Sequence, residues 1–119
     1  MTLKEFYETI GENYEDVFSR FGDEAFLKRF VIKFLDDPCF SDLKTALSRR
    51  DTEAAFRAAH TLKGICLNLG FQDLYKESAA VTERLRECVK SESAPANSRV
   101  PMNLESRYQA LIQKIRQLD

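Results

Sequence analysis

The sequence predicts an all-α protein, an up-and-down antiparallel four-helix bundle with additional short helices at its N-terminus. Apolar residues recur at spacings of three and four along most of the chain, and no segment shows the alternation that is typical of strands. The four glycines and three prolines fall mainly between these periodic segments, where they can end helices. Amphipathic helices with short connections bury their apolar faces most simply in such a bundle.

Composition and charge limit the class of protein. A chain of 119 residues fits one domain, spanning residues 1–119, and is long enough to bury a core of its own. The apolar fraction of 44% and the charged fraction of 31% are those of a soluble globular protein. A net charge of −1 gives no general attraction to nucleic acid or to anionic lipid, so we expect neither as a partner.

Hydropathy and cysteine usage point to the cytoplasm. Charges interrupt the N-terminal stretch MTLKEFYETIGENYEDVF throughout, which argues against a signal peptide. No apolar run approaches the roughly 20 residues that cross a bilayer. Cys39, Cys66 and Cys88 are widely spaced and form no C-x-x-C pair for zinc or redox chemistry. We therefore expect reduced thiols and a cytoplasmic protein.

Three helices are expected in the first third of the chain. Residues 2–10 and 13–21 predict two short amphipathic helices separated by Gly11. Asp23 can cap a third helix that runs to about Leu35, before the sequence DDP ends it. The apolar stripe of this third helix consists of Phe26, Leu27, Phe30, Val31 and Phe34. We assign the first two helices, residues 1–21, to the N-terminal addition and residues 23–118 to the bundle.

The remaining helices follow from caps and breaks. Ser41 can cap a short helix that ends near Arg49. Asp51 or Thr52 begins the next helix, which Gly70 ends as a C-cap. The last elements are a helix over residues 71–90, a loop over about 91–102 and a helix over residues 103–118.

The only histidine, His60, lies in the middle of the helix that Gly70 ends. With about 100° of rotation per residue, a wheel centred on Leu62 places the small and apolar residues of this helix within about 60° of the centre. These residues are Ala55, Ala58, Ala59, Ile65, Cys66 and Leu69. His60 falls about 160° away, so we expect its imidazole to face solvent.

Neighbours on the same helical face make His60 more than an ordinary surface residue. Gly64 lies one turn later, in a helix interior where glycine costs about 1 kcal/mol relative to alanine, and it leaves room for a large group to approach. Lys63 can offer a positive charge to an anion held on the ring. Phe56 and Leu67 place apolar side chains beside them, which indicates a docking patch.

The chemistry available to this face is limited. A metal site lacks ligands because there is no second histidine, and Cys66 lies about 120° around the helix from His60, on the buried face. No glycine-rich loop could bind ATP. A small enzyme that uses His60 as a general base remains a weaker alternative, because a convex helix offers no pocket. The best fit is a neutral imidazole that attacks a phosphoryl group presented by a partner protein.

The segment HTLKG, residues 60–64, followed by NLG, residues 68–70, resembles the H-x-L-K-G…L-G signature of histidine-containing phosphotransfer (HPt) domains. The resemblance extends from about residue 26 to residue 86. It implies a four-helix bundle with an exposed, phosphoryl-accepting histidine that exchanges the group with receiver-domain aspartates. His60 would then be the acceptor, Lys63 would help to hold the phosphoryl oxygens, and Gly64 would let the receiver close over the ring.

The partner-binding surface is expected to extend onto the next helix. Antiparallel geometry places position 81 near the level of His60, so Thr82 and Arg86 become candidate contacts. Related domains often have glutamine where Thr82 stands, and its hydroxyl is a shorter substitute. The other candidate partner-binding residues share the face of His60: Phe56, Leu67 and Asn68.

The resemblance also implies partners and an alternative function. Response-regulator receiver domains are the expected partners, with a hybrid histidine kinase as a further candidate. We expect a monomer without cofactor or kinase activity of its own, because magnesium would belong to the receiver. The alternative is a helical adaptor that binds receivers or kinases without chemistry. The missing glutamine favours the adaptor, whereas the pairing of Lys63 and Gly64 opposes it.

Overall fold

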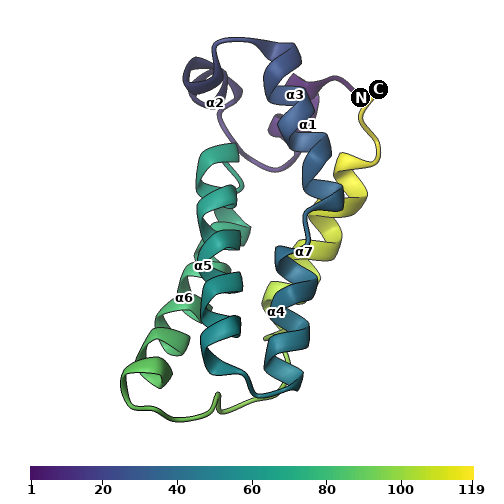
Figure 1. Cartoon of the computed structure of the whole chain (residues 1–119). Coiled ribbons are helices and arrows are strands. Elements are labelled where there is room, and N and C mark those ends of the chain that lie inside the picture. Colours follow the sequence, from purple (N-terminus) through teal and green to yellow (C-terminus); the bar gives the residue numbers. More distant parts are fainter.

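The computed structural model describes all 119 residues as seven α-helices, one short 3₁₀ helix and no strand (Figure 1). The all-α class is therefore confirmed. None of the helices is both long and apolar enough to span a membrane. The elements are α1 (Leu3–Thr9), α2 (Tyr14–Phe21), α3 (Glu24–Lys33), η1 (Phe34–Asp36), α4 (Cys39–Ser48), α5 (Thr52–Leu69), α6 (Gln72–Lys90) and α7 (Met102–Ile115).

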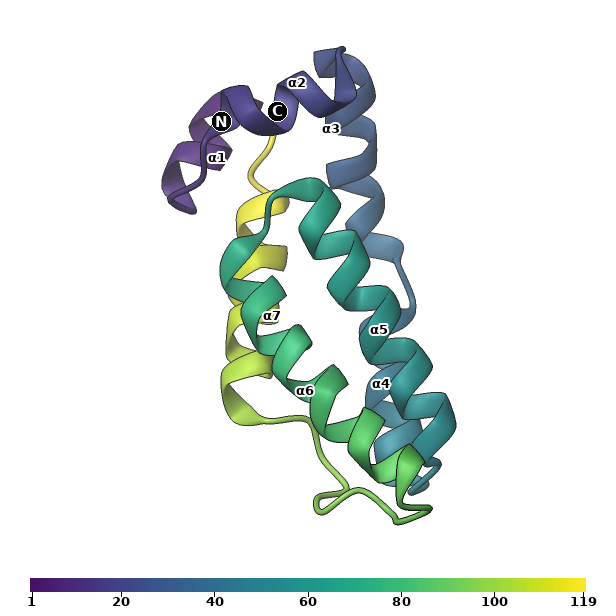
Figure 2. The same cartoon turned by 90° about the vertical axis from the view of Figure 1, so that its left-hand side faces the viewer.

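The helices α4, α5, α6 and α7 run alongside one another as the bundle (Figures 1 and 2). The two longest, α5 and α6, are antiparallel neighbours joined by a tight turn. On the opposite side, the Phe40 ring of α4 stacks on the Tyr108 ring of α7 with centroids 3.9 Å apart. Lys44 of α4 also pairs with Glu105 of α7 at 3.0 Å. These contacts close the bundle on the side away from α5 and α6.

The three N-terminal helices cover the end of the bundle at which α5 turns into α6 (Figures 1 and 2). The buried Tyr7 hydroxyl of α1 donates a hydrogen bond of 2.7 Å to the Leu69 carbonyl oxygen. At the start of α6, the Phe71 ring meets Phe6 and Phe34 edge-on, with centroids 6.1 and 5.4 Å away. Aromatic packing and one hydrogen bond thus fix α1 to the bundle.

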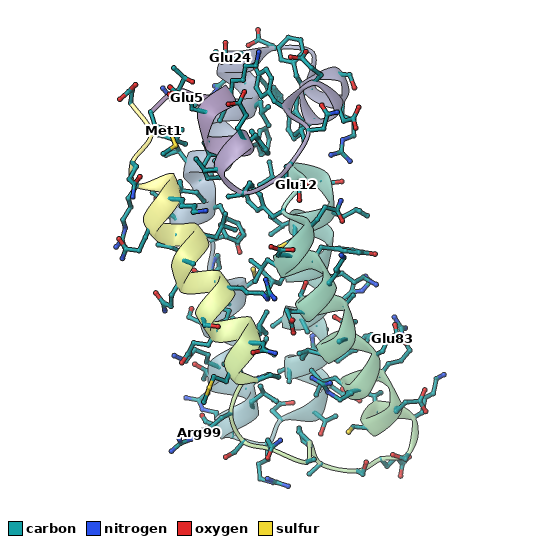
Figure 3. The ribbon with its side chains drawn as sticks, turned by 180° about the vertical axis from the view of Figure 1, so that it is seen from behind. Met1, Glu5, Glu12, Glu24, Glu83 and Arg99 are labelled. Atoms are coloured by element: carbon teal, nitrogen blue, oxygen red, sulfur yellow. The ribbon has the colours of Figure 1, made fainter.

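Both termini lie at this same end of the molecule (Figures 1 and 3). The Met1 amino group pairs with the Asp119 carboxylate at 2.9 Å. Lys114 of α7 donates to the Thr9 carbonyl oxygen at 3.0 Å. The last helix is therefore joined to the first by polar contacts as well as by the shared apolar core.

The ends of α5 agree with the sequence-based prediction. Asp51 is the N-cap, and its carboxylate accepts a hydrogen bond of 3.1 Å from the Ala54 amide. Gly70 is the C-cap, with a left-handed φ of 74°. A Cβ atom at position 70 would lie 2.5 Å from Val17 Cγ2, so close packing against α2 also favours glycine here.

One helix boundary was predicted wrongly, and another was predicted to within two residues. The third helix ends at Lys33, and the 3₁₀ helix η1 separates it from α4. The fourth helix begins at Cys39, two residues before the predicted cap Ser41. The physical reason is local, because the Asp37 carboxylate accepts a hydrogen bond of 2.9 Å from the Cys39 amide. Ser41 instead donates its hydroxyl to the Pro38 carbonyl oxygen inside the first turn.

The apolar stripe predicted for α3 is only partly buried. Leu27, Val31 and Phe34 are buried, whereas Phe26 and Phe30 are 36% and 42% exposed. The ring centroids of Phe26 and Phe30 lie 4.9 Å apart, and both rings contact the half-buried Phe21 of α2. The reason is the position of α3 at the end of the bundle, where the neighbouring helices cover only one of its sides (Figure 2).

Candidate functional site

The helix α5 presents the faces that the helical wheel predicts. Leu62, Ala59 and Cys66 are fully buried, and Ile65, at the edge of the predicted face, is half-buried. His60 is exposed on the opposite side. Because the core residues fix the rotation of α5, the imidazole has direct access to solvent and to a partner.

The helix surface is open beside His60 at Gly64. A Cβ atom at position 64 would meet no other atom within 4 Å, so neither packing nor an unusual φ explains this glycine. With no side chain at Gly64, the helix surface is unobstructed one turn from His60, on the same face of α5. Lys63 is half-buried beside it and forms no ion pair. Its ammonium group therefore remains available to an anion near the imidazole.

Two aromatic contacts connect His60 to α6. The His60 ring stacks on Phe56, one turn earlier on α5, with centroids 5.9 Å apart and planes inclined by 21°. The Arg86 guanidinium carbon lies over the same Phe56 ring, 5.0 Å from its centroid. Arg86 Nε also lies 3.4 Å from a Glu83 carboxylate oxygen on the outer side of α6 (Figure 3). The structure thus places the predicted residue Phe56 against the histidine and the predicted residue Arg86 against Phe56.

The surface continues from His60 towards the C-terminal end of α5. Leu67 is 44% exposed, and Asn68 is exposed beside it. Arg20 of α2, which sequence reasoning missed, donates a hydrogen bond of 3.3 Å to the Leu67 carbonyl oxygen. Arg20 is distant in sequence and occurs in no motif, so only the packing of α2 on the end of α5 could place it here.

The prediction that Thr82 contacts a partner is wrong. Thr82 is fully buried, and its hydroxyl donates a hydrogen bond of 2.7 Å to the Ser78 carbonyl oxygen in the preceding turn of α6. It therefore cannot replace a long polar side chain at the surface. The prediction placed Thr82 by its level along α6, whereas the rotation of α6 turns this position towards the core.

Other reactive groups do not contribute to the site. No three side chains of His, Cys, Asp or Glu lie close enough together to hold a metal ion. Cys39 and Cys66 are buried, and burial raises the pKa of the Cys66 thiol to about 12. A thiol held in its protonated form is a poor nucleophile. Unlike these two thiols, the His60 imidazole is exposed.

The fold and the site together define a helical bundle that displays a histidine on the exposed face of one of two antiparallel helices. The sequence model of the Hpt domain matches residues 36–118, and the chain therefore belongs to the Hpt domain family. Hpt domains act in histidine phosphotransfer within phosphorelays, where they interact with receiver domains and kinases. The match covers α4 to α7 and leaves α1, α2 and α3 outside it.

Comparison with curated proteins finds no match, and comparison with solved structures finds none.

Proposed function

We propose that this protein accepts a phosphoryl group on His60 from a receiver-domain aspartyl phosphate and donates it to another receiver aspartate. The observation that supports this most strongly is the exposed imidazole beside the open surface at Gly64, inside the segment that matches the Hpt domain. An exposed ring on a convex helix can enter a pocket that the partner supplies. The protein then needs no pocket of its own.

The proposed step conserves atoms and charge. A ring nitrogen of neutral His60 uses its lone pair to form an N–P bond, while the P–O bond to the partner aspartate breaks. The aspartate leaves as a carboxylate, and the other ring nitrogen keeps its proton. In the reverse direction, a carboxylate oxygen of the second receiver attacks phosphorus and the imidazole leaves.

Each neighbour has a role in this step. The Lys63 ammonium reduces the repulsion between the phosphoryl oxygens and the attacking group. Gly64 gives the receiver close access to the ring. Magnesium is held by the receiver, and this chain supplies neither a cofactor nor ATP hydrolysis.

The test uses the full chain and receiver domains loaded with acetyl phosphate. We expect the wild-type chain to take up an acid-labile, base-stable label from a cognate receiver. His60→Gln should abolish this label and leave the fold intact, because an exposed substitution shifts stability by about 0.5 kcal/mol or less. Thermal melts monitored by circular dichroism provide the control for folding.

The same experiment can contradict the proposal. Label on the His60→Gln variant would show that another residue is the acceptor. Receivers that bind the wild-type chain tightly but never transfer to it would support the adaptor alternative. A large loss of stability in His60→Gln would show that the imidazole is part of the packing.

A further inference from the structure

The His60 imidazole makes an aromatic contact and no hydrogen bond. In many sites a hydrogen bond to one ring nitrogen fixes the orientation of a nucleophilic or basic histidine. No such hydrogen bond is made by His60, whose ring instead contacts the Phe56 ring one turn earlier. A nucleophile on a convex, solvated helix would otherwise sample several rotamers.

The stacked geometry can orient the imidazole without engaging its nitrogen atoms. A centroid distance of 5.9 Å with planes inclined by 21° is within the range of offset stacking between aromatic rings. Stacking engages the face of the imidazole, whereas both nitrogen atoms lie at its edge. The edge therefore stays free to attack phosphorus.

Phe56 is itself held from two sides. Its ring is half-buried and packs against the core cluster. The Arg86 guanidinium from α6 covers the ring at 5.0 Å, and Glu83 holds Arg86 through a contact of 3.4 Å. The aromatic ring is thus fixed by α6 as well as by its own helix.

We propose that Phe56 is a positioning residue for phosphotransfer, which holds the imidazole of His60 in the orientation from which a ring nitrogen attacks. The inference rests on the proposed function of His60. It assigns Phe56 a role other than docking, because the Phe56 ring acts through His60. Limiting the rotation of the nucleophile raises the fraction of encounters that are aligned for attack.

The kinetic test compares Phe56→Leu, which keeps apolar volume, with Phe56→Tyr, which keeps the ring. The phosphodonor is a receiver domain loaded with acetyl phosphate. We expect Phe56→Leu to reduce the maximal transfer rate about tenfold at saturating receiver, with the Kd for that receiver within about twofold of wild type. Phe56→Tyr should transfer at close to the wild-type rate.

A second measurement does not depend on phosphotransfer. The side-chain NMR signals of His60 should carry a ring-current shift that Phe56→Leu removes and Phe56→Tyr keeps. Tyr108→Leu removes a half-buried ring of α7 that stacks on Phe40 of α4, and it controls for the general loss of an aromatic contact. We expect Tyr108→Leu to alter neither the His60 signals nor the maximal rate.

Several results would overturn the inference. These are unchanged His60 signals in Phe56→Leu, an unchanged maximal rate, a loss confined to receiver affinity, or a Tyr variant as impaired as the Leu variant. If the wild-type chain takes no label at His60, the proposed function fails separately, and the NMR comparison still decides whether Phe56 orients the imidazole.

Discussion

At the scale of single residues, the access role that we propose for Gly64 and the helix propensity of glycine predict opposite effects of substitution. The position is helical and has open space around it, so Gly64→Ala should stabilise the fold by up to about 1 kcal/mol. Gly64→Gln should keep most of that gain while its longer side chain obstructs the approach to His60. We expect thermal melts to show equal or higher stability and transfer assays to show a slower rate.

The matched control for Gly64→Gln is Ala110→Gln, at an exposed position of α7. It adds the same side chain elsewhere on the bundle and should leave transfer unchanged. A Gly64→Gln protein that melts earlier than wild type yet transfers normally would contradict the access role of Gly64.

At the scale of helices, the end of α5 depends on backbone conformation and on close packing together. Gly70 and Gly22 both adopt a φ of 74°, but only at Gly70 would a Cβ atom collide with a neighbour, Val17. Alanine in the left-handed region costs about 1–2 kcal/mol. Gly22→Ala should lower the free energy of unfolding by about that amount, and Gly70→Ala should lower it by clearly more.

Urea unfolding of the two variants measures this difference. Equal losses would mean that α2 moves away from α5 without cost, and that the packing of the N-terminal helices on the bundle is weak. A larger loss at Gly70 would show that α2 contributes to the stability of the whole domain.

At the scale of the whole molecule, buried cysteine thiols and a buried tyrosine hydroxyl predict a loss of stability in alkaline solution. Burial raises the pKa of the Cys66 thiol from its ordinary value of 9.0 to about 12, and it also raises the pKa values of Cys39 and Tyr7. Between pH 9 and about pH 12, the Cys66 thiol loses its proton in the unfolded chain and keeps it in the folded chain. The stabilisation is therefore complete below pH 9 and declines as the pH rises towards 12.

The measurement is the free energy of unfolding in urea at pH 8 and at pH 10.5. The fully buried Cys66 thiol should contribute a decrease of about 2 kcal/mol over this interval. Cys66→Ala should show a smaller decrease than wild type, whatever its stability at pH 8. An identical decrease in both proteins would show that the Cys66 thiol ionises freely in the folded state.

Features that depend on local periodicity and on local caps were predictable from the sequence alone. The spacing of Leu62, Cys66 and Leu69 predicted which side of α5 is buried, and hence that His60 is exposed. Asp51 and Gly70 predicted both ends of the same helix. These predictions succeed because rotation per residue and capping chemistry are properties of a few consecutive residues.

The tertiary structure was needed to show how neighbouring elements meet. It turned Thr82 into the core, left Phe26 and Phe30 exposed at the end of the bundle, and brought Arg20 to Leu67. It also placed Arg86 over the Phe56 ring on which His60 stacks. Such contacts depend on the rotation and tilt of one helix relative to another, which ridge-and-groove packing along their full lengths determines and no local pattern encodes.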